Sequence, residues 1–168
     1  MSETERFQRE QRNQKMAVSI RVPSLENERD ILRSYQPNED FNLEVIKKER
    51  ENSQVFLLEY GSKSLLLYYF DNNEFVTVIS NNGNEKVKGD TTEIYSKAKE
   101  IMQQEANQSK KSQHYEVSTK DPKMTRWANS KGKELFHWKN IIEPTDEGKD
   151  WVFVTKIEPS SKTRQSIL

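Results

Sequence analysis

The sequence predicts an α/β fold, with one mixed, mostly antiparallel twisted sheet that carries helices on both faces. Two apolar runs, Val55–Tyr60 and Ser64–Phe70, flank Gly61-Ser62-Lys63, which has the length and residue types of a hairpin turn. The second run is apolar on both faces, as expected of an interior strand covered on each side by helices. A third run, Phe75–Ile79, leads through a glycine-bearing loop into an amphipathic helix. We therefore expect Ser64–Phe70 at the interior of the sheet.

Length and composition favour one folded unit with polar ends. The 168 residues suit a single domain, but only 32% are hydrophobic, 32% are charged and the mean hydropathy is −1.03. Apolar residues must therefore be concentrated in a few elements. We predict a polar tail or helix over residues 1–15, a single domain over 16–158 and a flexible tail over 159–168.

Several absences predict a cytoplasmic, intracellular protein that does not enter a membrane. The sequence has no cysteine, which is compatible with a reducing compartment. No run approaches the roughly 18 apolar residues of a membrane span. Residues 1–15 lack the apolar region of a secretory signal.

The N-terminal part alternates apolar and polar residues and then takes on helical spacing. Met16–Val22 reads as a half-buried strand, with Met16, Val18, Ile20 and Val22 inward. After Pro23, Ser24 is expected to cap a helix that runs to about Ser34. Its inward residues would be Leu25, Ile31, Leu32 and Tyr35.

The next segment is ambiguous between helix and strand. Asn38 is a candidate cap for a helix that runs to about Asn52, with Phe41, Val45 and Ile46 on one face. A strand over Leu43–Lys48 is the competing interpretation, because its apolar residues are few and adjacent. We favour the helix.

The helix that follows Phe75–Ile79 has a strong start signal. Asp90 is a good N-cap, and Glu93 completes a capping-box pattern. Apolar residues then recur at helical spacing as far as about Gln108: Ile94, Tyr95, Ala98, Ile101 and Met102. The free N–H groups and the positive dipole end of such a helix suit an anion such as phosphate, although an ordinary capped helix would look the same.

The C-terminal part predicts three strands and one helix. Tyr115–Val117 reads as a short strand after a polar linker, Ser109–Gln113. Asp121-Pro122 is a helix start, with Met124, Trp127 and Ala128 inward and Gly132 as the stop. Glu134–Trp138 and Trp151–Ile157 read as the last two strands.

This element order resembles the GNAT superfamily of acyl-CoA-dependent N-acyltransferases, from Met16 to Ile157. Lys86-Val87-Lys88-Gly89-Asp90-Thr91, followed by Ile94, keeps the glycine of the family's cofactor loop but departs from it at Lys86 and Thr91. The spacing of the second family motif is also kept, although several of its residue identities are changed. The residues at its positions are Glu116-Val117, Asp121, Met124, Ala128 and Gly132.

The resemblance implies a cofactor and a site for it. Acetyl-CoA, or another acyl-CoA, would place its pyrophosphate on the backbone N–H groups of Lys86, Val87, Lys88, Gly89, Asp90 and Thr91. Its pantetheine arm would run beside the strand residues Thr77, Val78 and Ile79, near the helix cap Asp121. Phe75–Ile79 and Tyr115–Val117 would run parallel and splay apart to admit this arm.

The resemblance also implies transfer of the acyl group to an amine, of a small molecule or a protein. Ala128 occupies the place of the family's usual proton-donating tyrosine, so Tyr115 is a candidate substitute, and Glu74 a candidate base or amine-binding carboxylate. A core tyrosine and a turn residue are the structural alternatives for these two residues. His114 and His137 are far apart, with no ligand-spaced partner, so no metal site is predicted.

Two other functions remain open at this stage. With the tyrosine lost, the chain could be a catalytically inactive GNAT-like interaction subunit. Alternatively, the segment 109–141, with eight Lys and Arg against three Asp and Glu, could bind single-stranded nucleic acid together with Tyr115, Trp127 and Trp138. A sequence pI near 6.8 argues against nucleic acid.

Overall fold

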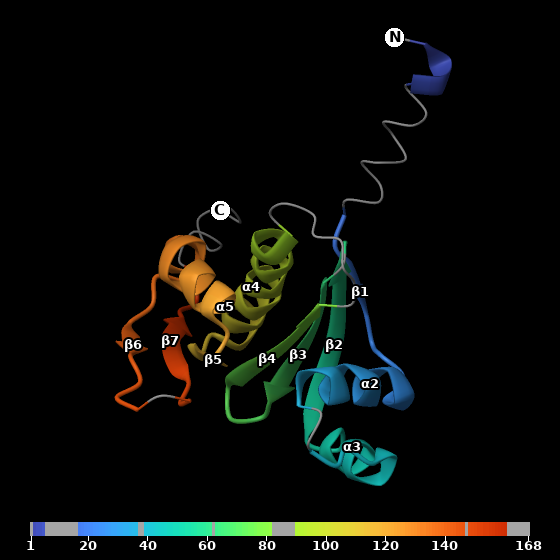
Figure 1. The fold of residues 1–168 in the computed structure, drawn as a ribbon, viewed down its shortest axis with the longest axis horizontal. Coiled ribbons are helices and arrows are strands. Elements are labelled where there is room, and N and C mark those ends of the chain that lie inside the picture. Colours follow the sequence, from blue (N-terminus) through green and yellow to red (C-terminus); the bar gives the residue numbers. More distant parts are fainter. Residues whose placement is uncertain are drawn as a thin grey trace.

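The computed structural model describes residues 2–5, 17–36, 39–61, 63–81, 90–146 and 148–160. The strands are β1 (Ser19–Arg21), β2 (Ser53–Tyr60), β3 (Lys63–Phe70), β4 (Glu74–Asn81), β5 (Gln113–Thr119), β6 (Asn140–Ile142) and β7 (Trp151–Ile157). The helices are α2 (Leu25–Tyr35), α3 (Leu43–Glu49), α4 (Asp90–Ser109), α5 (Pro122–Trp127) and α6 (Lys133–Phe136), and a π-helical segment, Ala128–Gly132, joins the last two. Figure 1 shows their arrangement.

These strands form one seven-stranded sheet in the order β1-β2-β3-β4-β5-β7-β6. Every pair of neighbours is antiparallel except β4 and β5, which run parallel. The predicted mixed, mostly antiparallel sheet is confirmed, with β3 in its interior. β2 and β3 are joined by a tight hairpin in which Tyr60 lies opposite Lys63, and Gly61 takes the positive φ (57°) that the turn requires.

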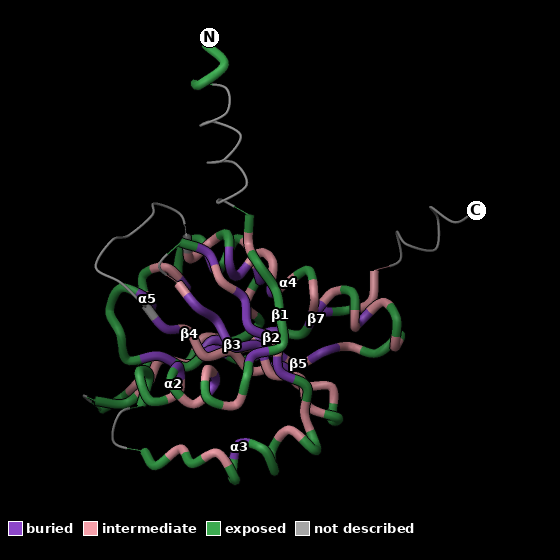
Figure 2. Tube along the Cα trace, turned by 90° about the vertical axis from the view of Figure 1, so that its right-hand side faces the viewer, coloured by how far each residue is buried: buried purple, intermediate pink, exposed green. Residues whose placement is uncertain are grey.

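The sheet is buried on both faces, and Figure 2 shows that the buried residues gather in its central strands. On one face, Leu58, Leu65 and Leu67 join the large cluster that includes the apolar side of α4. On the other face, Leu57 and Leu66 pack with residues of α2, and α3 lies beside α2. Because successive strand residues point to opposite faces, the continuous apolar run in β3 serves both clusters.

The N-terminal strand is shorter and more exposed than predicted. β1 forms an edge of the sheet, and Ile20 and Val22 are 40% and 66% exposed. Among the described elements, α2 packs mainly against β3 and β4, and the main contacts of β1 are with β2. Met16 lies outside the described residues. Ser24 caps α2 as predicted, since its Oγ accepts a hydrogen bond from the Asn27 N–H at 3.1 Å.

The ambiguous segment Leu43–Glu49 is a helix, as predicted. Its cap is Asn42, whose Oδ1 accepts from the Val45 N–H at 2.9 Å. Asn38, the predicted cap, lies outside the described residues. The helix ends at Glu49 and not near Asn52, because Ser53 already pairs with Phe70 in the sheet.

The prediction that Gly132 ends a helix and that Glu134–Trp138 is a strand was wrong. Gly132 has helical angles, φ −62° and ψ −38°, and the chain continues through α6 until His137 enters the left-handed region at φ 50°. A glycine is needed at position 132 because the neighbouring Trp127 ring leaves no room for a side chain. A Cβ there would lie 3.0 Å from Cζ3 of Trp127. The strand on the outer side of β7 is instead β6 (Asn140–Ile142), further along the chain.

Among the helices that the structure describes, none has the length and apolar character needed to cross a membrane.

Candidate functional site

β4 and β5 separate along their length, and a cleft lies where they part. The two parallel strands pair only at Glu74↔His114, Phe75↔Tyr115 and Val76↔Glu116. β4 runs on to Asn81 and β5 to Thr119 without further pairing to each other. The predicted parallel and splayed arrangement is confirmed.

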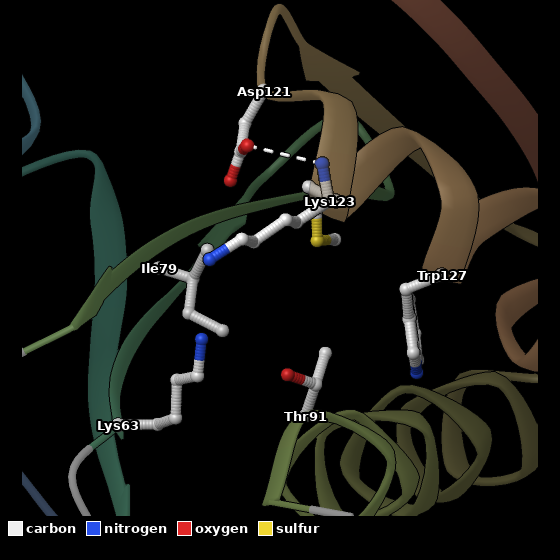
Figure 3. Close-up of a pocket in the computed structure, with 7 residues that line it drawn as sticks. Lys63, Ile79, Thr91, Asp121, Lys123 and Trp127 are labelled. Carbon is white, nitrogen blue, oxygen red and sulfur yellow. Dashed lines mark hydrogen bonds between the residues drawn. The ribbon is translucent and has the colours of Figure 1, made fainter. Parts of the chain in front are cut away.

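The first lobe of the cleft lies between the N-terminus of α4 and the start of α5 (Figure 3). Its volume is about 300 Å³. Lys63 of β3 and Lys123 of α5 direct their amino groups toward the space beside Ile79. The positive dipole end of α4, at Thr91, lies in the same wall. This combination of charges favours an anionic group. The lining consists of Lys63, Ile79, Thr91, Asp121, Lys123, Met124 and Trp127.

The second lobe adjoins the first, has a volume of about 330 Å³ and reaches the C-terminal end of α2. Hydroxyl groups dominate its polar lining, and Ser34 Oγ of α2 lies 3.0 Å from Ser80 Oγ of β4. Burial and the nearby carboxylate of Asp150 raise the pKa of Tyr35. Residues that line this lobe are Ser34, Tyr35, Lys63, Ile79, Ser80, Thr119, Asp121 and Met124.

A buried ion pair fixes α2, which forms one wall of this second lobe. Glu28 is only 2% exposed, and its Oε1 accepts from Nε of Arg50 at 2.8 Å. Its Oε2 accepts from the hydroxyl of Tyr68 at 2.7 Å. Arg50 also donates to the carbonyl of Pro23 at 2.8 Å. These bonds tie α2 to β3 and to the end of α3, and so set where Ser34 and Tyr35 lie.

A chain of buried hydroxyl groups lies where the strands part. Thr77 is the first β4 residue beyond the paired positions, and its Oγ1 is 2.7 Å from the hydroxyl of Tyr115. The hydroxyl of Tyr95 on α4 also hydrogen-bonds Thr77. Burial raises the pKa of Tyr95 and of Tyr115 above the ordinary value of a phenol, so both stay protonated and can donate.

Trp127 forms the α5 wall of the first lobe. Its ring stacks on Tyr95 with centroids 4.7 Å apart, and its Nε1–H donates to Thr92 Oγ1 at 2.9 Å. Gly132 leaves room for the ring, as described above. The wall therefore connects α5 firmly to the first turns of α4.

The structure brings several of the predicted site residues together. Ile79, Thr91 and Asp121 line the cleft, and Thr77 lies where it begins. Val78 belongs to the same strand, but its side chain packs on the opposite face of the sheet, with the α2 cluster. Asp90 is the first residue of α4, while Lys86, Val87, Lys88 and Gly89 lie outside the described residues.

The two predicted catalytic residues lie differently from what the sequence indicated. Glu74 pairs with His114 at the closed end of the strand pair, so it is not a cleft residue. Its position at the start of β4 puts it five residues before Ile79, about 17 Å away along an extended strand. Tyr115 is fully buried, and it approaches the cleft only through its hydrogen bond to Thr77.

Sequence reasoning missed several cleft residues. Lys63 was assigned to a turn, although it is the first residue of β3. Trp127 was assigned to the core, although it also lines the cleft. Ser80 and Thr119 could have been found, because each follows the predicted end of one parallel strand, and the carboxyl ends of such strands meet at one edge.

The aromatic residues of the segment 109–141 do not form a nucleic-acid surface. Tyr115 is fully buried, Trp127 stacks on Tyr95, and Trp138 stacks on Phe136 while its Nε1–H donates to the Ala128 carbonyl at 2.9 Å. Bases stack on exposed rings, and these rings are used in packing.

No protein-family model matches the chain, and no curated relative matches it by sequence. Several solved structures, in contrast, are similar to the chain in fold. The spermidine/spermine N-acetyltransferase of Vibrio cholerae is 12% identical, with a TM-score of 0.57 over 90% of this chain and 98% of that one. The ribosomal-protein-S18-alanine N-acetyltransferase of Escherichia coli is 12% identical, with a TM-score of 0.54 over 86% and 97%. A Bacillus subtilis acetyltransferase in complex with CoA is 11% identical, with a TM-score of 0.53 over 86% and 99%.

These similarities establish the fold. The chain has the fold of the GNAT N-acetyltransferases, as the resemblance in sequence implied, and the neighbouring structures span nearly their whole length in the match.

Proposed function

We propose that this protein is an N-acyltransferase that moves an acyl group from acetyl-CoA, or another acyl-CoA, to an amine. One observation carries the proposal: β4 and β5 part after Val76 and Glu116, beside the positive end of α4. Several proteins of the same fold are N-acetyltransferases, and one is in complex with CoA.

The backbone of β4 offers a docking edge for the cofactor arm. Beyond Val76, the edge of β4 that faces β5 has no strand partner in the described part of the chain. Buried backbone N–H and C=O groups require hydrogen bonds, and the amides of a pantetheine arm can supply them at residues 77 to 79. The arm would thus add to the sheet where β5 departs from it.

The mouth of the first lobe suits the cofactor's pyrophosphate. The loop predicted to bind it, Lys86–Thr91, joins β4 to α4, and its last residue lines this lobe. Lys123 adds positive charge from the α5 wall. Phosphate would therefore meet backbone N–H groups and a helix dipole from one side, and an ammonium group from the other.

Transfer itself requires direct attack by a neutral amine on the thioester carbon. The N–C bond forms, the C–S bond breaks and its electron pair leaves on sulfur, while a base takes the amine proton. Ala128 is fully buried and has no proton to give. A thiol with a pKa near 8.5 can leave as the anion. We assign the stabilisation of that anion to the Thr77 hydroxyl, which is hydrogen-bonded to two neutral tyrosines at the point where the strands part.

Two measurements test the proposal. Calorimetry with acetyl-CoA and with CoA should show binding, and release of free CoA should depend on an added amine. We expect slow turnover that rises toward alkaline pH, where more of the amine is neutral. Binding without CoA release, over a broad amine panel, would instead identify an inactive interaction subunit. No binding of acyl-CoA would overturn the proposal.

A further inference from the structure

The charges of the second lobe indicate which amines it accepts. Asp121, at the start of α5, and Lys63, at the start of β3, line both lobes. Figure 3 shows them on opposite sides of the space beside Ile79, Asp121 above and Lys63 below. They make no ion pair with each other. The cleft thus presents separated charges of opposite sign.

A second carboxylate, that of Asp150, acts near this lobe. Asp150 immediately precedes β7, and its carboxylate acts electrostatically on the Tyr35 phenol at the rim. Asp121, which follows β5 and precedes α5, lies on the β5 side of the lobe, while Lys63 is on the side formed by β3. Ser34, Ser80 and Thr119 add hydroxyl groups to the same lining.

We infer that the acceptor is a zwitterionic amine of the amino-acid type, with its amino group on the Asp121 side and its carboxylate, or another anionic group, against Lys63. This inference rests on the proposed acyl transfer and names its substrate class. A ligand with one positive and one negative group matches both fixed charges, whereas a polyamine would meet the lysine as a like charge.

The consequence is a measurable preference for an acid over its amide. An amino acid and its primary amide share the same side chain and the same nucleophile, and differ in the anionic group. Hydrogen bonds to charged groups contribute about 1.5–3 kcal/mol, which corresponds to roughly tenfold or more in kcat/KM. Without charge recognition the amide would be the better acceptor, because its amine loses its proton more readily.

The experiment compares a panel of L-amino acids with their amides and with spermidine, in the wild type and in lysine variants. Lys63→Met should reduce the acid-to-amide ratio to about one, by raising KM for the acid, and leave the Kd of acetyl-CoA within about twofold. Lys63→Arg should keep the preference. The matched control is Lys156→Met, at an exposed residue of β7 that pairs with His114 at the closed end of the strand pair, and it should change neither the ratio nor the Kd.

Two results would overturn the inference. The first is equal use of the acid and the amide by the wild type. The second is a Lys63→Met variant that loses acetyl-CoA affinity but keeps the acid-to-amide ratio, because that result would assign Lys63 to the cofactor phosphates.

Direct titration of an acid and its amide into the protein separates this inference from the proposed function. Tighter binding of the acid supports it, and equal binding contradicts it, even if acetyl-CoA fails to bind.

Discussion

Thr77 Oγ1 and the hydroxyl of Tyr115 lie 2.7 Å apart, across the point where β4 and β5 stop pairing. The bond joins the two strands just as the sheet divides. It also turns the hydroxyl of a fully buried tyrosine toward the only polar side chain of the Phe75–Ile79 run. Tyr115 is thereby a positioning residue for Thr77.

Tyr115→Phe should therefore lower turnover and leave cofactor affinity unchanged. Removing one hydrogen bond of about 1–1.5 kcal/mol from the chain predicts a loss of about tenfold in kcat. Tyr69→Phe, which removes a hydroxyl bonded to Glu105 outside the cleft, is the matched control. An unchanged kcat with an increased Kd for acetyl-CoA would assign Tyr115 to cofactor binding.

Gly89→Val should abolish acetyl-CoA binding while the protein stays folded. Gly89 lies outside the described residues, so this prediction rests on the family loop that its sequence resembles, where a side chain would obstruct the approach of backbone to phosphate. Calorimetry measures the affinity, and circular dichroism checks the fold. Wild-type affinity in the variant would count against this loop as the pyrophosphate site.

Gly132→Ala should destabilise the protein by about 1–3 kcal/mol, a typical cost of overpacking. The added Cβ would lie 3.0 Å from the Trp127 ring, which itself stacks on Tyr95. Denaturant unfolding measures the effect. In the background of Trp127→Leu the same substitution should cost much less, because the two residues are in contact and their effects are not additive. If the free-energy losses of the two substitutions were fully additive, the Trp127 ring would not be the cause of the destabilisation by Gly132→Ala.

Arg50→Met should destabilise the protein by about 3–5 kcal/mol, because it leaves the buried Glu28 carboxylate without its ionic partner. The control is Arg21→Met in the exposed pair with Glu59, where less than about 1 kcal/mol is expected. Chemical unfolding of both variants gives the comparison. Equal small losses would mean that Glu28 is protonated or hydrated in the native state.

Stability should fall above about pH 10. Burial, followed by the hydrogen bond to Glu28, raises the pKa of Tyr68, and burial raises the pKa of Tyr95 and Tyr115. The folded state then holds these protons while the unfolded chain releases them near pH 10, so each tyrosine lowers the free energy of unfolding by up to about 1.4 kcal/mol per pH unit above that value. Tyr68→Phe should make the decline shallower, as measured by unfolding at successive pH values. A flat profile from pH 9 to 12 would contradict the burial of these phenols.

Where sequence reasoning failed, packing had decided the outcome. Gly132 carries a strong local stop signal, yet its backbone is helical and the chain continues into α6; a glycine suits this position because the Trp127 ring fills the space that a side chain would need. Ile20 and Val22 alternate like a half-buried strand, yet both are exposed, because the described helix α2 packs mainly against β3 and β4. Glu74 was placed beside the cofactor by its strand, but the strand register puts it at the closed end.

The sequence by itself determined the hairpin, the interior position of β3 and the caps at Ser24 and Asp121. These follow from side-chain periodicity and from hydrogen bonds between residues close in sequence. The parallel strands that splay around the cleft were implied by the resemblance to the GNAT superfamily and not by these local patterns. The tertiary structure alone decided that Lys63, Asp121 and Trp127 share one cleft and that Tyr115 reaches it through Thr77. The cause is long-range packing: residues 35 or more positions apart meet only after the sheet order and the placement of α4 and α5 are fixed.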